Sequence, residues 1–152
     1  MDRPPTAHAA VRAAVAAATG TLPLFAGGKS FGARMTSQTH AHGRLPSVRD
    51  LVFFGYPLHP AGKPSTDRAE HLSDVHIPML FLQGTKDALA DRSLIRGVVN
   101  ELGDRATLVT IPDAEHSFHV PARSGRTDNQ VLEDMLDAAA EWMRRFIAGR
   151  TA

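Results

Sequence analysis

The chain has no cysteine, no long hydrophobic run and no excess of charge of either sign. The absence of Cys among its 152 residues excludes disulfides, thiolate catalysis, zinc fingers and iron–sulfur clusters. No segment reaches the roughly 18–20 consecutive apolar residues that a membrane-spanning helix needs. Lys and Arg number 17 against 16 Asp and Glu, a formal net charge of +1. Electrostatics therefore gives no reason to expect nucleic acid or an acidic membrane as a partner.

The alanine-rich segment near the N-terminus lacks the features of a secretory signal. Asp2, Pro4 and Pro5 make a poor basic region, and Arg12 interrupts the small apolar residues between 9 and 24. These features favour a cytoplasmic protein.

Apolar runs alternate with amphipathic segments along the whole chain. At 43% hydrophobic and 22% charged residues, the composition is typical of one globular domain, residues 1–152. Strands that are apolar throughout and separated by helices predict a parallel sheet covered on both faces. The fold class is therefore α/β, a three-layer sandwich with a mostly parallel sheet of about four strands. The expected strands are 22–26, 50–55, 78–83 and 106–111, and the expected helices are 6–19, 31–40, 91–102 and 129–148.

Polar and titratable residues follow each expected strand. In an open parallel sheet the ligand site lies beyond the carboxyl ends of the strands. The segments there are, in chain order, Gly28-Lys29-Ser30-Phe31-Gly32, Tyr56-Pro57-Leu58-His59, Asp87, and Asp113-Ala114-Glu115-His116.

The first of these segments has the pattern G-x-S-x-G between a strand and a helix. Such a turn holds Ser30 in a strained conformation with Oγ exposed, and the flanking glycines avoid clashes with neighbouring backbone. The helix that starts near Phe31 directs its N–H groups at the same point and can stabilise an oxyanion. A phosphate-binding loop is the competing interpretation, but Pro23 stands where that motif needs glycine. A glycine-rich turn with a solvent-facing serine remains open.

A serine hydroxyl needs a histidine to take its proton and a carboxylate to orient that histidine. Asp87 follows the third strand and His116 the fourth, which gives the chain order Ser, Asp, His of an α/β-hydrolase. Asp91 is better explained as the N-cap of the following helix, and His119 lies further from its strand end than His116. A turn role for Asp87 and a surface-loop role for His116 remain open.

The remaining candidates are substrate-binding rather than catalytic. Lys29 flanks the serine, and Tyr56 and His59 follow the second strand, so we expect all three near the substrate. Ion pairing or solvation is the alternative for Lys29. His59 and His71 could in principle bind a metal together with His42, but their spacing matches no metal-ligand signature, so we expect neither a metal nor an organic cofactor.

Four motifs together resemble a known family: GGKSFGARM at 27–35, GYPLHPAGKP at 55–64, QGTKD at 83–87 and EHSF at 115–118. They are similar to small α/β-hydrolases of the dienelactone-hydrolase-like branch. Within that branch they resemble bacterial predicted hydrolases related to a testis-expressed hydrolase-like protein and to a histone-acetyltransferase subunit. The resemblance extends from about residue 5 to residue 148. It implies that Ser30 is the nucleophile, His116 the general base and Asp87 the orienting acid, with the Phe31 N–H as an oxyanion donor.

The chain departs from this family before its nucleophile. Only 29 residues precede Ser30, enough for one helix and one strand. The resemblance therefore implies an N-terminally truncated domain, the C-terminal half of the fold, without the loop that supplies a second oxyanion donor. An apolar edge strand would be left at 22–26, which predicts a homodimer through that edge.

Two functions are expected from these residues. The first is an esterase-like serine hydrolase that acts on a small acyl or ester substrate. The alternative is a weak or inactive hydrolase-like scaffold, or a fragment, used for protein interaction or dimerisation.

Overall fold

Four parallel strands form one sheet in the order β1-β2-β3-β4. The computed structural model describes residues 3–18 and 20–149. The strands are β1 (Leu24–Lys29), β2 (Val48–Phe54), β3 (Met79–Gly84) and β4 (Ala106–Ile111). The α-helices are α1 (Pro4–Ala17), α2 (Phe31–His42), α3 (Arg92–Leu102) and α4 (Asp128–Gly149). Three short 3-10 helices lie at Asp67–Asp74, Gly103–Arg105 and Ala122–Ser124.

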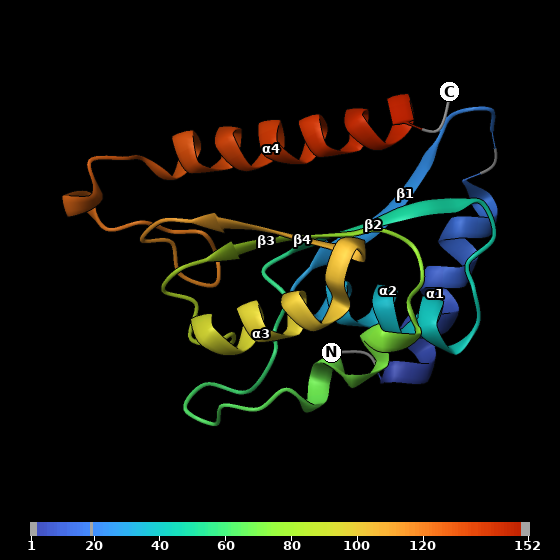
Figure 1. Cartoon of the computed structure of the whole chain (residues 1–152), viewed down its shortest axis with the longest axis horizontal. Helices are drawn as coiled ribbons and strands as arrows, with labels where there is room; N and C mark the ends of the chain where they lie inside the picture. The colour runs from blue at the N-terminus through green and yellow to red at the C-terminus, as the bar shows by residue number, and fades with distance from the viewer. Residues whose placement is uncertain (1–2, 19, 150–152) are drawn as a thin grey trace.

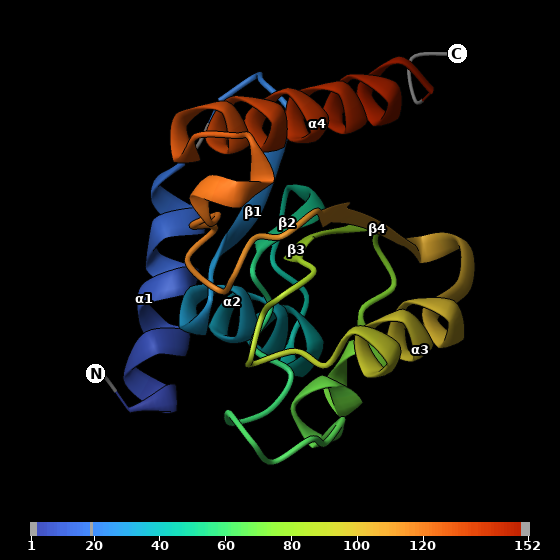
Figure 2. The ribbon, with the colours of Figure 1, turned by 90° about the vertical axis from the view of Figure 1, so that its left-hand side faces the viewer.

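Helices cover both faces of the sheet, as Figures 1 and 2 show. α1, α2 and α3 lie on one face, and α4 runs along the other. The predicted α/β fold with a covered parallel sheet is therefore confirmed.

The larger part of the core lies on the face that carries α1, α2 and α3. Alternate residues of β2 and β3 point to this side, and Leu51, Phe53, Met79 and Phe81 are fully buried there. Phe53 and Phe81 pack edge to face at 5.0 Å between ring centroids, with the ring of Tyr56 next to both. Edge-to-face rings add to the stabilisation from burial, so this cluster holds β2 and β3 firmly in place.

The opposite face has a smaller core under α4. Val52, Leu80 and Leu82 pack there against Trp142. The Trp142 indole N–H also donates to Thr107 Oγ1 at 3.1 Å, which ties α4 to β4.

Apart from β4, every strand and α-helix has bounds that differ from the prediction by one to three residues, and β1 begins at Leu24 instead of residue 22. The first strand extends through Gly27 and Gly28 to Lys29, instead of ending at residue 26, because both glycines pair in register with β2. The first helix begins at Pro4, since a proline is well tolerated in a helical first turn. Its predicted end at Thr19 lies outside the described residues.

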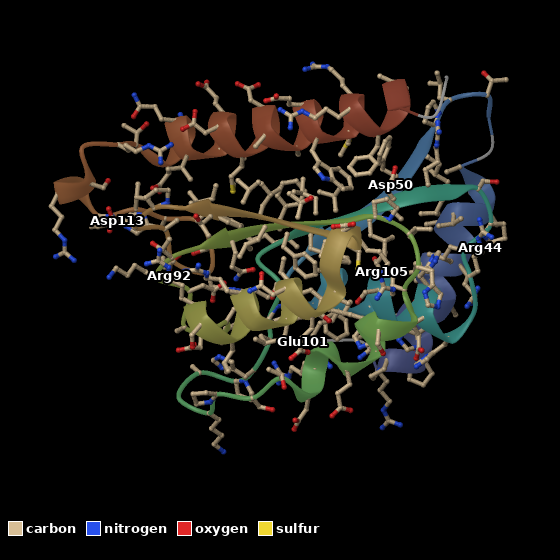
Figure 3. The ribbon with its side chains drawn as sticks, viewed as in Figure 1. Arg44, Asp50, Arg92, Glu101, Arg105 and Asp113 are labelled. Atoms are coloured by element: carbon tan, nitrogen blue, oxygen red, sulfur yellow. The ribbon has the colours of Figure 1, made fainter. Side chains whose placement is uncertain are left out.

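The carboxyl ends of the strands lie together at one end of the molecule. Figure 3 shows Asp113, which follows β4, and Arg92, the first residue of α3, at this end, and Arg44 at the opposite end. None of the helices within residues 3–18 and 20–149 combines the length and apolar character needed to cross a bilayer.

Candidate active site

Ser30 occupies a strained turn between β1 and α2. Its backbone has φ 53° and ψ −118°, a conformation that L-residues rarely adopt. A Cβ at Gly28 would lie 2.8 Å from the Gly32 carbonyl carbon, so the turn requires glycine at position 28. Apart from its chain neighbours and the backbone of its own helix, a Cβ at Gly32 would meet no described atom within 4 Å. The expectation that both flanking glycines relieve backbone clashes therefore holds for Gly28 and is wrong for Gly32.

A continuous chain of hydrogen bonds joins Ser30, His116 and Asp87. The distance from Ser30 Oγ to His116 Nε2 is 2.8 Å, and that from His116 Nδ1 to Asp87 Oδ2 is also 2.8 Å. The Asp87 side chain is fully buried, whereas that of His116 is 22% exposed. With Nδ1–H donating to the carboxylate, Nε2 has its lone pair directed at the serine hydroxyl. This is the arrangement in which the histidine can take the serine proton.

The carboxylate of Asp87 is held by two further donors. The Leu89 N–H donates to Oδ1 at 2.8 Å, and Gln83 Nε2 donates to Oδ2 at 2.5 Å. The same amide accepts, through Oε1, a hydrogen bond from the Tyr56 N–H at 2.9 Å. Gln83 thus links the loop after β2 to the acid after β3. Sequence reasoning missed it, although it is the polar end of an otherwise apolar strand.

Two glycines allow the loop that carries His116 to approach the sheet closely. A Cβ at Gly84 would lie 2.3 Å from the Ala114 carbonyl oxygen, so only glycine fits there. Gly55 has φ +65°, and a Cβ on it would lie 3.3 Å from the His116 carbonyl oxygen. The Lys86 N–H donates to Ala114 O at 2.9 Å and secures the loop. The ends of β2 and β3 therefore set the position of the histidine.

The start of α2 provides N–H groups beside the serine. The Ser30 N–H itself donates to Phe54 O at 3.0 Å and is not free to bind an oxyanion. Phe31 is the first residue of α2, and a helix leaves the N–H groups of its first turn outside its own hydrogen-bond ladder. The Phe31 N–H, at the positive end of the helix dipole, is available for negative charge that develops next to Ser30.

Tyr56 and His59 lie close to this site, but their polar atoms are used within the loop. The Tyr56 hydroxyl donates to Arg68 O at 2.8 Å, and burial raises the pKa of this phenol to about 12. His59 is 3% exposed; its Nδ1–H donates to Pro60 O, and its Nε2 accepts from the Asp91 N–H. Neither side chain has a free polar atom to offer a substrate.

Asp91 and His119, the alternatives to Asp87 and His116, have other hydrogen-bond partners. Asp91 accepts hydrogen bonds from the Ser93 and Leu94 N–H groups, and this confirms it as the N-cap of α3. His119 pairs with Asp128 at 2.8 Å on the surface. This hydrogen bond raises the pKa of His119 and lowers that of Asp128.

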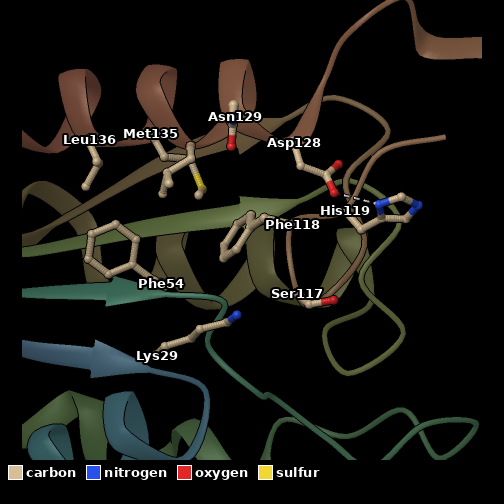
Figure 4. A pocket seen from close by; sticks show the side chains of 10 residues that line it. Lys29, Phe54, Ser117, Phe118, His119, Asp128, Asn129, Met135 and Leu136 are labelled. Atoms are coloured by element: carbon tan, nitrogen blue, oxygen red, sulfur yellow. Dashed lines mark hydrogen bonds and ion pairs between the residues drawn. The ribbon is translucent and has the colours of Figure 1, made fainter. Parts of the chain in front are cut away.

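Lys29 lines an apolar groove next to the site (Figure 4). The groove has a volume of about 530 Å³ and lies between α4 and the ends of β1 and β2. We call it the α4 groove; its lining residues are Lys29, Phe54, Ser117, Phe118, His119, Asp128, Asn129, Leu132, Met135 and Leu136. The Lys29 ammonium lies 5.9 Å from the centroid of the Phe118 ring.

A family model described as an alpha/beta hydrolase domain matches residues 1–144 of the chain. The fold is also similar to that of solved structures. An a/b serine hydrolase without lid from Xanthomonas campestris is 26% identical, with a TM-score of 0.60; the match covers 88% of this chain and 54% of that one.

Two further structures are similar in fold alone. Esterase 2 from Thermogutta terrifontis, in its apo form, is 21% identical with a TM-score of 0.63, and the match covers 91% of this chain and 63% of that one. A monoacylglycerol lipase from Paleococcus ferrophilus is 14% identical with a TM-score of 0.70, and the match covers 95% of this chain and 76% of that one. The chain spans 54% of the length of the Xanthomonas hydrolase and 63% of that of the Thermogutta esterase. None of these similarities identifies the narrower dienelactone-hydrolase-like branch, so membership of that branch stays a prediction.

Proposed function

The chain belongs to the alpha/beta hydrolase family, and we propose that it is a serine hydrolase that cleaves small ester substrates. One observation carries this proposal: Ser30, His116 and Asp87 come from three separate strand ends and form one unbroken hydrogen-bond chain. Packing alone gives no reason to align these three side chains.

The proposed reaction proceeds in two halves. Ser30 Oγ attacks the ester carbonyl while His116 Nε2 accepts its proton, and the buried Asp87 carboxylate stabilises the imidazolium. The Phe31 N–H donates to the oxyanion. His116 then protonates the leaving alcohol, and water attacks the acyl-enzyme by the reverse sequence of proton transfers.

The class of substrate is inferred from the apolar surroundings of the site and from the related structures. The names of those proteins include esterases and a monoacylglycerol lipase, which act on carboxylic esters. We propose a small-molecule ester for this chain as well.

The proposed domain is a single α/β-hydrolase-like unit, residues 1–152, without the strands that precede β1 in the expected family. It therefore supplies one oxyanion donor, Phe31, from its own described residues. Loss of one such donor costs about 10²–10³ in rate, so we expect slow turnover for the chain alone. The alternative function, a hydrolase-like scaffold, is favoured by the short span of the chain relative to its relatives. The cytoplasmic location stays a prediction.

We also propose that the chain forms a homodimer through β1. This strand is at the end of the strand order, and the preceding Leu22 is 84% exposed. Unpaired strand edges next to apolar side chains pair readily with a second chain. Light scattering at micromolar concentration should give twice the 16.4 kDa chain mass, and a monodisperse monomer would contradict the dimer.

Ester hydrolysis tests the proposed function. We expect Ser30→Ala to abolish hydrolysis of p-nitrophenyl butyrate, because the proposed acyl-enzyme forms on Ser30 Oγ. Ser73→Ala is the matched control, since Ser73 is an exposed serine whose hydroxyl donates only to Glu70 O. A Ser30→Ala chain as fast as the parent would favour the scaffold function.

A further inference from the structure

The lining of the α4 groove includes residues next in the chain to two members of the proposed triad. Lys29 and Ser117 both line the groove, and they are the chain neighbours of Ser30 and His116. In Figure 4 the Lys29 side chain extends from the end of β1 toward Ser117. One end of the groove is therefore a single residue along the chain from both Ser30 and His116.

The wall of the groove includes an aromatic ring held in an unfavourable backbone conformation. Phe118 has φ 68°, which bulky residues rarely adopt, and it is only 5% exposed. A turn hydrogen bond from its N–H to Glu115 O, at 2.9 Å, maintains this conformation. Strain of this kind persists where the surrounding structure enforces it, and it is concentrated at ligand sites.

The other wall of the groove is the side of α4 that faces the ends of β1 and β2. Leu132 and Leu136 are one helical turn apart and are 48% and 51% exposed. In Figure 4, Leu136 and Met135 point from α4 toward Phe54 on β2. Exposed leucines gathered along one groove mark a binding surface for an apolar ligand.

The length of the groove indicates the size of that ligand. Its lining on α4 runs from Asp128 to Leu136, a rise of about 12 Å along the helix. An extended chain of about ten carbons spans this distance, at about 1.25 Å per C–C bond.

We infer that the α4 groove binds the acyl chain of a medium-chain ester, with Leu132, Leu136 and Phe118 as the residues that select chain length. This inference rests on the proposed function, and it goes further by naming the substrate class. The ester carbonyl lies at the Lys29 end, beside Ser30, and the chain extends under α4.

The test is a chain-length series of p-nitrophenyl acetate, butyrate and octanoate. For the parent, kcat/KM should rise at least about tenfold from acetate to octanoate. Leu132→Gln and Leu136→Gln should each lower kcat/KM for octanoate about tenfold more than they lower it for acetate. Glu133→Gln, at an exposed residue of α4 that does not line the groove, is the control and should change neither.

Two results would overturn the inference while the proposed function stands. One is a parent without preference for longer chains. The other is an equal loss for acetate and octanoate in the groove variants. A third result concerns the oligomeric state. The groove variants could convert a dimeric parent to monomers without changing its preference for acyl-chain length. The groove would then bind a second copy of the protein, and the inference would also fail.

A binding measurement separates failure of the groove from failure of the proposed function. Calorimetry with decanoate and Ser30→Ala needs no turnover. Ser30→Ala could hydrolyse esters as fast as the parent, and the proposed function would then fail. Decanoate binding to Ser30→Ala that is weakened by adding Leu136→Gln would still show that the groove binds an acyl chain. Absence of binding would overturn it.

Discussion

The two faces of the sheet are covered to very different extents. On one face, α1, α2 and α3 pack over β2 and β3, and Leu51, Phe53 and Phe81 are fully buried. On the other, α4 is the one described helix, and Leu132 and Leu136 remain about half exposed.

This difference separates two tasks within one site. The proposed catalytic groups hold their geometry through buried contacts: Asp87 has three hydrogen-bond donors, and the His116 loop rests on glycines of β2 and β3. The open face keeps an apolar groove free beside the same serine. Changes in the buried part should therefore cost catalysis or folding, whereas changes along the groove should alter selectivity.

The largest effect should come from His116. We expect His116→Ala to lower kcat/KM at least about 10³-fold, because the proton acceptor for Ser30 is lost. Ester hydrolysis of purified protein is the measurement. His76→Ala, at an exposed histidine far from the site, should stay near parental activity; comparable rates for both variants would remove His116 from the mechanism.

The next effect concerns the packing beneath the His116 loop. Gly84→Ala would place a Cβ 2.3 Å from Ala114 O, and the backbone must shift to accept it. We expect a loss of about 2–3 kcal/mol in the free energy of unfolding, measured in urea. Gly97→Ala is the control, because that helical glycine has open space around it, and it should gain about 0.5–1 kcal/mol. Equal stability of the two variants would contradict the close approach at Gly84.

Replacement of Gln83 tests whether this residue positions Asp87 or takes part in substrate binding. Gln83→Leu removes the acceptor of the Tyr56 N–H and one of the two donors to Asp87 Oδ2, which keeps His116, at a cost of roughly 1–3 kcal/mol in stability. We expect kcat to fall about tenfold with KM nearly unchanged, since substrate does not contact this amide. A change confined to KM would show that Gln83 has a different role.

The smallest effect is a pH dependence on the covered face. Burial, with the nearby Arg34 charge as a second cause, lowers the pKa of His71 from 6.5 to about 4. Between these values the unfolded chain binds more protons than the folded one, so stability is complete above pH 6.5 and decreases toward pH 4. After allowance for solvent screening, the free energy of unfolding falls by about 2 kcal/mol between pH 6.5 and pH 4 because of His71.

His71→Asn should remove that contribution. Urea unfolding of parent and variant at pH 7 and pH 4.5 measures it, and the parent should lose more stability between the two. The same loss in both proteins would mean that His71 does not titrate in this range.

Much of the fold and the triad could be predicted from the chain alone, for physical reasons. Apolar runs such as 78–83 indicate buried strands directly, and Asp91 before a periodic segment indicates a helix start. Ser30, Asp87 and His116 could be selected because parallel strands end at one edge, although their catalytic role stays a prediction.

Other features depend on contacts that no local pattern contains. The 3-10 helix at 67–74 is short and polar, and its sequence resembles a loop. The use of Gln83 as a bridge depends on where the Tyr56 loop returns to the sheet. Tyr56 and His59 lie at the expected strand end, but their side chains turn into the loop's own hydrogen bonds.

The central claim is that Ser30 is activated by its hydrogen bond to His116. Its most direct test is the intact mass of the parent and of Ser30→Ala after treatment with a fluorophosphonate probe. We predict one adduct on the parent and none on the variant. An unmodified parent, or the same adduct on both proteins, would contradict the claim.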